Sequence, residues 1–429
     1  MRKIDKLKKG LRGFCWVCEV NLIGEIKMIA RNQIPVVVMS SLALLIVFLL
    51  GCSSDSQSEK STETTSSQDE QSGIGSEEDQ AKPLGPGKFS ETGKLAYARG
   101  WHVTVKLNDG RVLSMAGKSR GGSSAWEPSG IADSEFYDPD TEKWSEAPLM
   151  RDIREVPSGN LLKDGRVIII GGAAVRQKPQ TTVEIFDPNS NSWTVAAEMA
   201  TPRWRHRSVV LNDGRVLVVA GEREDTILVP EAEIYDPETD TWSDAGSLQV
   251  KRAMHTLTLL NDGRALVVGG GGQDTKTKVV EIYDPEQNTW TLGAETNLSH
   301  SAHTATLLND GRVLVTGGKG KVTKGEVYDP EADTWTDIGE MTEWRAEHAA
   351  VLLADGRVLV TGGIGKVDST DIFDPITNTF SPGPKSLIAR YAHSMTLLDD
   401  GRILIVGGNS TDVDSGDRAI TTEVEIWTP

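Results

Sequence analysis

Short apolar runs separated by polar turns alternate along the chain from about residue 90 to its end. The turn Asp-Gly-Arg, followed directly by an apolar run, occurs seven times at intervals of 45 to 55 residues. Short runs bounded by turn residues are typical of β-strands, and this region has no helical periodicity of useful length. The turn glycines are Gly110, Gly165, Gly214, Gly263, Gly311, Gly356 and Gly401.

Two further signatures recur in these intervals. The apolar run ends in Gly-Gly or Ala-Gly, and about 15 residues later most copies read Tyr or Phe, Asp, Pro, then an aromatic residue five positions beyond the Pro. Asp-Gly closes tight hairpins because it tolerates positive φ, and Pro ends a strand because it has no N–H to donate. Each interval therefore predicts four strands, the fourth carrying the aromatic residue. The Tyr/Phe-Asp-Pro copies begin at Tyr137, Phe186, Tyr235, Tyr283, Tyr328 and Phe373.

These residues resemble the kelch repeat, and the resemblance covers residues 89–429. It implies an all-β fold, a seven-bladed kelch-type β-propeller with one four-stranded blade for each repeat. A related form of the repeat occurs in the propeller of galactose oxidase.

The two ends of the repeat region predict how the ring closes. The last repeat stops at Pro429, after its third strand, so one outer strand is missing. Phe89 and His102 have the same spacing as Trp335 and His348, which connect the fifth repeat to the sixth. We therefore expect Phe89 to lie in the outer strand of the last blade, which removes an exposed sheet edge.

Charge and cysteine content exclude several function classes. The chain of 429 residues carries a formal net charge of −17, which argues against nucleic-acid binding because phosphate neutralisation needs a basic face. Cys15, Cys18 and Cys52 all precede the repeats, so the propeller has no disulfide and no thiolate nucleophile. We expect a monomer.

The N-terminal region predicts export. Ile34–Leu50 is an apolar run of about 17 residues. Leu49-Leu50-Gly51-Cys52 resembles a bacterial lipobox, which implies lipidation of Cys52 and anchoring to a membrane. A single uncleaved membrane helix is the alternative, for which the run is just long enough. A start at Met28 rather than Met1 gives a signal of conventional length.

The chain therefore has three predicted parts. Residues 1–52 form a signal and membrane-targeting segment with the lipobox, and residues 89–429 form the propeller. Residues 53–88 are rich in Ser, Thr, Gln, Glu and Asp, a composition that cannot bury enough apolar surface to fold. They predict a disordered acidic tether. The expected location is the cell envelope, with the propeller facing outside the cytoplasm.

An Arg-x-x-His pattern recurs where the chain crosses from one predicted blade to the next. His300 takes the place of Arg in the fifth copy, and Pro157 takes the place of His in the second. The histidines are His102, His206, His255, His303, His348 and His393, and the arginines are Arg99, Arg154, Arg203, Arg252, Arg345 and Arg390.

Two interpretations of this pattern stay open. The arginines can form a cationic ring at the channel mouth that attracts anionic ligands, and partner-binding kelch proteins commonly use this face. Alternatively, residues repeated in every blade bond the backbone of the neighbouring blade, an interpretation that we favour for the histidines. Aromatic residues in some copies only, which either bind a ligand or pack beneath loops, are Trp101, Trp204, Trp344 and Tyr391.

The sequence predicts no catalytic constellation, no metal site and no cofactor. The galactose oxidase family binds copper near this region, but its chemistry requires a tyrosine cross-linked to a cysteine, and the propeller has no cysteine. The second-to-third-strand loops vary most and contain Arg120 and Trp126 in the first repeat. In the last repeat, Asp412, Asp414 and Asp417 fit either an acidic surface loop or a calcium site of unusual spacing.

The preferred function is an exported, membrane-tethered binding module for a protein or carbohydrate ligand. An anionic ligand is one form of this prediction. The alternatives are an enzyme acting on a sugar or sugar acid in the central funnel, and a structural envelope protein. Candidate ligand-binding residues are Arg99, Trp101, Arg154, Arg203, Trp204, Arg252, His300, Trp344, Arg345, Arg390 and Tyr391.

Overall fold

The computed structural model describes residues 18–20, 26–28, 85–119, 130–174, 177–272, 277–365, 367–411 and 418–429. The chain divides into two units, Met1–Ser76 and Glu77–Pro429. The described residues of the first unit form a hairpin of β1 (Cys18–Val20) and β2 (Ile26–Met28). The predicted signal run, Cys52 and the predicted tether up to residue 84 lie outside the described residues. Within the described part, no helix is both long and apolar enough to cross a membrane.

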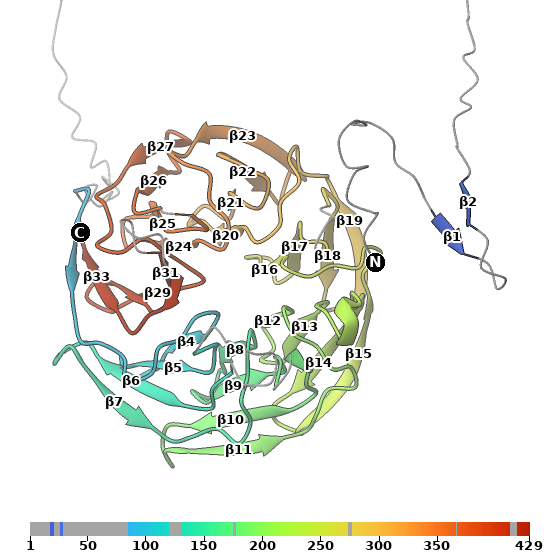
Figure 1. Cartoon of the computed structure of the whole chain (residues 1–429), viewed down its shortest axis with the longest axis horizontal. Coiled ribbons are helices and arrows are strands. Elements are labelled where there is room, and N and C mark those ends of the chain that lie inside the picture. Colours follow the sequence, from blue (N-terminus) through green and yellow to red (C-terminus); the bar gives the residue numbers. More distant parts are fainter. Residues whose placement is uncertain are drawn as a thin grey trace, which may run out of the picture. The chain divides into compact units, whose positions relative to one another are not determined.

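The second unit is built from antiparallel sheets, which confirms the predicted all-β propeller class (Figure 1). Its described residues contain seven four-stranded sheets, one for each repeat. The first four sheets comprise β4 (Val103–Lys106), β5 (Val112–Met115), β6 (Ser134–Asp138) and β7 (Lys143–Ala147); β8 (Ser158–Leu161), β9 (Val167–Ile170), β10 (Val183–Asp187) and β11 (Ser192–Ala196); β12 (Arg207–Val210), β13 (Val216–Val219), β14 (Glu231–Asp236) and β15 (Thr241–Ser247); and β16 (Thr256–Leu259), β17 (Ala265–Val268), β18 (Val280–Asp284) and β19 (Thr289–Gly293).

The last three sheets complete the ring. They comprise β20 (Thr304–Leu307), β21 (Val313–Thr316), β22 (Lys324–Asp329) and β23 (Thr334–Glu340); β24 (Ala349–Leu352), β25 (Val358–Thr361), β26 (Thr370–Asp374) and β27 (Thr379–Pro382); and β29 (Ser394–Leu397), β30 (Ile403–Val406), β33 (Val424–Thr428) and β3 (Lys88–Glu91). A smaller sheet joins β28 (Arg390–Tyr391), β31 (Asn409–Thr411) and β32 (Arg418–Ile420), and η2 (Glu224–Thr226) is a short 3₁₀ turn. The innermost strands contact one another in the closed order β4, β8, β12, β16, β20, β24, β29 and again β4.

The N-terminal strand closes the last sheet. β3 pairs antiparallel with β33, and Phe89 lies opposite Trp427. The predicted position of Phe89 is therefore confirmed. This pairing joins the first and last described strands of the propeller in one sheet, and it leaves no gap in the ring of blades.

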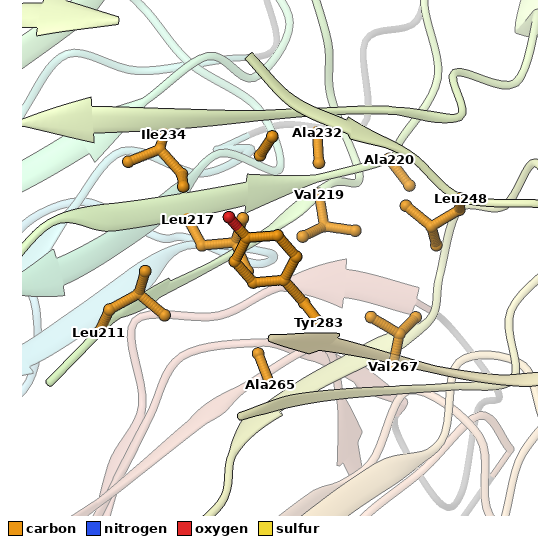
Figure 2. Close-up of a cluster of buried hydrophobic side chains, with 11 residues drawn as sticks. Leu211, Leu217, Val219, Ala220, Ala232, Ile234, Leu248, Ala265, Val267 and Tyr283 are labelled. Carbon is orange, nitrogen blue, oxygen red and sulfur yellow. The ribbon is translucent and has the colours of Figure 1, made fainter. Parts of the chain in front are cut away.

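Hydrophobic contact between adjacent sheets forms the core. On β13, Val216 and Val218 pack toward the preceding blade, whereas Leu217 and Val219 pack against the following one. Figure 2 shows Leu217 and Val219 with Tyr283 of the following sheet. Because successive side chains of a strand point to opposite faces, a strand buried on both faces reads as a continuous apolar run. The second strand of each repeat is buried at all four positions, and its residues are apolar except for Ser114, Thr316 and Thr361.

The outer tryptophans connect neighbouring blades. Trp242 packs on Tyr235 with ring centroids 5.1 Å apart, and its indole N–H donates to the carbonyl of Ala197 in the preceding blade at 2.8 Å. Equivalent bonds to a carbonyl of the neighbouring outer strand or the segment that follows it are made by Trp144, Trp193, Trp290 and Trp335. The recurring aromatic residue thus fills the wedge between blades and satisfies its polar atom there.

Glycine occupies the end of the second strand in five of the seven repeats, and Ala116 and Ala220 occupy it in the other two. This end lies against the next crossing segment, the stretch between the outer strand of one blade and the inner strand of the next. Gly317 has a φ of +66°, and a Cβ there would lie 2.5 Å from the carbonyl oxygen of Arg345 and 2.7 Å from the His348 ring. A Cβ at Gly317 would strain this approach, although Ala116 and Ala220 take the equivalent position with φ of 58° and 56° in the first and third blades. The first glycine of the pair therefore lets the crossing segment lie close to the sheet.

Candidate functional site

A cavity of about 450 Å³ lies where the crossing segments converge on the central channel. Its rim is formed by the third residue of each Arg-x-x-His pattern, one from every blade. We call this set the mouth ring: Trp101, Val156, Arg205, Met254, Ala302, Glu347 and Ala392. The cavity is also lined by His102, Pro157, Arg207, His303, Lys319, His348 and His393.

The mouth ring has a repeating backbone. All seven residues have left-handed φ angles between 49° and 55°. Several of them are joined by backbone hydrogen bonds from one blade to the next, such as Ala392 N–H to Glu347 O at 2.8 Å and Glu347 N–H to Ala302 O at 2.9 Å. Left-handed φ is uncommon for residues other than glycine and costs energy, so the surrounding structure holds it in place.

The side chains of the mouth ring differ between most blades, and alanine alone occurs twice. They include an indole, a guanidinium, a carboxylate, a thioether and small apolar groups, and each of the seven is partly exposed. The first position of the pattern is buried in every copy, as is the second. A uniform frame therefore presents six different kinds of side chain to one cavity, with alanine occurring twice. This is the arrangement expected of a recognition surface, because functional sites break internal symmetry.

The six recurring arginines do not reach this cavity. Arg203 is fully buried, and its Nη2 lies 2.6 Å from Glu233 Oε1 while its Nη1 donates to the carbonyl of Ala220 at 3.0 Å. Burial lowers the pKa of Arg203, and the Glu233 carboxylate opposes that shift. The corresponding buried pairs are Arg99–Glu135, Arg154–Glu184, Arg252–Glu281, Arg345–Asp371 and Arg390–Glu425.

These pairs correct the expectation that the arginines form a cationic ring at the channel mouth. Each carboxylate also accepts backbone N–H groups of the crossing segment, as Glu233 does from Ala200 at 2.7 Å. A buried charge is tolerated when it is paired and hydrogen-bonded, and all six guanidinium groups meet this condition. Their role is to fasten the crossing segments to the third strands, and a ligand in the cavity does not contact them.

His300 substitutes for arginine in the fifth blade. Its Nδ1 lies 2.7 Å from the carbonyl oxygen of Gly317, and its Nε2 lies 2.6 Å from Glu326 Oε2. The ring is fully buried. His300 therefore reproduces the carbonyl and carboxylate contacts of the arginines. These contacts correct the prediction that His300 binds a ligand.

Five of the six recurring histidines bond the neighbouring blade, through side-chain hydroxyls rather than the backbone that the sequence favoured. His206 Nε2 lies 2.8 Å from Ser158 Oγ, and His393 Nε2 lies 2.8 Å from Thr361 Oγ1. Burial, with nearby arginine charge, lowers the pKa of His102 and that of His348 to about 3. These rings are neutral at physiological pH and add no positive charge to the cavity. Among the described residues, no group of three or more His, Cys, Asp or Glu is arranged to hold a metal ion.

The four predicted aromatic residues occupy different environments. Trp101 lines the cavity and donates its indole N–H to Glu347 Oε2 at 3.0 Å, and Tyr391 packs edge-on against it with centroids 5.9 Å apart. Trp204 is buried, with the Arg205 guanidinium 4.1 Å from its ring centroid. Trp344 is partly exposed and is not part of the cavity lining. Trp101 is thus the one predicted residue that lines the cavity.

The positive charge of the cavity comes from residues that the sequence analysis did not single out. Among the described residues, Arg205, Arg207 and Lys319 line it, and Glu347 contributes the one lining carboxylate. A sequence signal for the mouth ring existed, since the third position of the Arg-x-x-His pattern differs between most copies. The predicted loop residues Arg120, Trp126, Asp412, Asp414 and Asp417 lie outside the described residues.

Comparison with known proteins agrees with this architecture. A family model described as the KLHDC2/KLHL20/DRC7 Kelch-repeats domain matches residues 102–318. A fungal alcohol oxidase of the AA5 family, solved in complex with copper, is similar with a TM-score of 0.65 and 18% identity, covering 80% of this chain and 77% of that one. The structure of YjhT is similar with a TM-score of 0.53 and 17% identity, covering 68% of this chain and 100% of that one. No curated protein matches the chain.

Proposed function

Since the chain belongs to the kelch-repeat domain family, we propose that its propeller is a binding module that holds a protein or carbohydrate ligand at the mouth ring. Kelch propellers commonly serve as protein-interaction modules. The observation that carries the proposal is the contrast within the Arg-x-x-His pattern. Its buried first position is nearly invariant, whereas its exposed third position differs in most blades and lines one cavity.

The chemistry of the cavity favours a polar ligand with an apolar face. Trp101 offers a ring surface, on which sugars and planar groups stack. Arg205 has a partly exposed side chain and is held by Glu222, 3.2 Å from its Nη1, so it is oriented before a ligand arrives. Pre-oriented side chains lose less conformational entropy on binding.

The same proposal includes export and anchoring of the module. The apolar run Ile34–Leu50 followed by Cys52 supports a lipoprotein signal. The polar segment that follows would give the propeller freedom to reach ligands away from the membrane. In this proposal the propeller is displayed outside the cytoplasm.

A glycan array and a panel of purified envelope proteins, probed with the full-length protein, test the proposal. We expect Trp101→Ala and Arg205→Ala to lose the binding that the wild-type protein shows. Ile376→Ala is the matched control, because Ile376 is 83% exposed and does not line the cavity. If all three variants bind as the wild type does, the ligand site is not at the mouth ring.

A further inference from the structure

The residue that follows each Arg-x-x-His pattern is the first residue of the inner strand. It is small or medium-sized in six of the seven blades. The third blade has an arginine at this position. In chain order the residues are Val103, Ser158, Arg207, Thr256, Thr304, Ala349 and Ser394. Arg207 lines the cavity together with the mouth ring.

In other blades this position bonds the histidine of the following blade. Ser158 Oγ lies 2.8 Å from His206 Nε2, and Thr256 Oγ1 lies 3.0 Å from His303 Nε2. Arg207 occupies the equivalent place before His255. Neither ring nitrogen of His255 has a hydrogen-bond partner among the described residues. Arg207 therefore replaces a hydroxyl that would join two blades, so packing does not explain its presence.

Arg207 also differs from the six buried arginines in having no counter-ion. Its hydrogen bond runs from Nη1 to the carbonyl of His206 at 3.1 Å, and no ion pair joins it to any residue that the structure describes. Burial lowers its pKa. Arg207 is only partly buried and lines the cavity, so a cation without an internal anion is there in reach of an anion that enters the cavity.

The surroundings of Arg207 favour such an anion. Arg205 and Lys319 add two further cations to the lining. Glu347, the one carboxylate in the described part of the lining, already accepts the indole N–H of Trp101. His348 has a pKa of about 3 and is therefore neutral, so it contributes no charge to the lining. A guanidinium group presents two parallel N–H donors that match the two oxygens of a carboxylate.

We propose that Arg207 anchors a carboxylate group of the ligand, which enters the cavity acid-first. This inference rests on the proposed function and adds the chemical class that the site selects. The carboxylate can belong to a uronic acid or to an acidic amino-acid side chain, and both present the same planar pair of oxygens. Removal of one charge-assisted bidentate contact is expected to weaken binding about tenfold to a hundredfold.

The test uses isothermal titration of the full-length protein with two matched pairs of probes. D-glucuronate is compared with D-glucose, and N-acetylglutamate amide with N-acetylglutamine amide. We expect binding of at least one acid with at least about tenfold preference over its neutral partner. The pair that shows the preference identifies the source of the carboxylate.

Arg207→Thr is the decisive variant, because it restores the residue type found in neighbouring blades. We expect it to lose the preference for the acid and to unfold at a higher temperature than the wild type, since it can bond His255 and removes an unpaired charge. Arg207→Lys retains the positive charge but lacks the two parallel N–H donors of the guanidinium, so it should lose most of the preference for the acid over its neutral partner. Equal binding of acid and neutral probes by the wild type, or an unchanged preference in Arg207→Thr, would overturn the inference. Neutral glycan binding that Trp101→Ala abolishes would in that case leave the proposed function standing.

Discussion

The burial of the recurring arginines predicts a large loss of stability when one of them is truncated. Arg252 and Glu281 are both fully buried, with Nη2 2.6 Å from Oε1. Arg252 Nη1 also donates to the carbonyls of Gly269 and Val279, both at 2.9 Å. Arg252→Met removes these bonds and leaves the Glu281 carboxylate buried without its cation. Breaking a buried pair from one side costs about 3 to 5 kcal/mol, so the free energy of unfolding should fall by that amount.

Urea denaturation followed by tryptophan fluorescence measures this loss, and a double-mutant cycle assigns it. In the Arg252→Met background, Glu281→Gln removes the unpaired charge, and the double variant should lose less stability than the sum of the single ones by about 1 to 3 kcal/mol. Arg264→Met is the control, because Arg264 pairs with Asp262 at the surface and an exposed pair contributes below about 1 kcal/mol. A cost for Arg252→Met no larger than that of Arg264→Met, together with lost ligand binding, would refute the structural role.

Four further predictions follow from individual sites. His300→Arg should fold with a stability within about 1 kcal/mol of the wild type by urea denaturation, because six blades already use Arg at this position, whereas His300→Ala should lose about 1 to 3 kcal/mol through the unpaired Glu326 carboxylate. Gly317→Ala should fold but lose about 1 to 3 kcal/mol, as thermal unfolding will show, because its φ is +66° and a Cβ would lie 2.5 Å from the Arg345 carbonyl oxygen, whereas Ala116 and Ala220 show that the position accepts alanine in other blades. His348 has a pKa of about 3 in the folded state and an ordinary value near 6.5, so its contribution to the free energy of unfolding is complete above pH 6.5 and is lost as the pH falls toward 3. At pH 5 protonation of this one ring in the unfolded state should lower the free energy of unfolding by about 2 kcal/mol. His348→Gln should reduce the pH dependence of that free energy by the same amount. Metabolic labelling with palmitate should mark the wild-type protein and not Cys52→Ser; label retained in that variant would contradict a lipid anchor at this residue.

The fold was predictable because its signals are local and redundant. Turn residues and strand periodicity appear in seven copies, so an irregular copy such as the last one does not obscure the pattern. The pairing of Phe89 with Trp427 followed from spacing alone, since the missing strand had to come from the other end of the repeats.

The site was less predictable because it depends on contacts between blades. An acidic residue two positions before each Tyr/Phe-Asp-Pro, such as Glu233, lies in an otherwise apolar strand and signals a buried cation partner, but the sequence alone does not place it beside Arg203. The left-handed backbone of Val156 or Glu347 is equally hidden, because neither residue type favours positive φ. Arg207 stands out only once its neighbours show that every other blade has a smaller residue there.

Site-specific blocking of the mouth ring tests the central claim most directly. In a protein with Cys15, Cys18 and Cys52 replaced by serine, single cysteines at Ala392→Cys and Ile376→Cys are modified with a bulky maleimide, and binding to the glycans or proteins captured by the wild type is measured. We predict that modification at residue 392 abolishes binding and that modification at residue 376 leaves it unchanged. Undiminished binding after full modification at residue 392 would contradict the placement of the ligand site at the channel mouth.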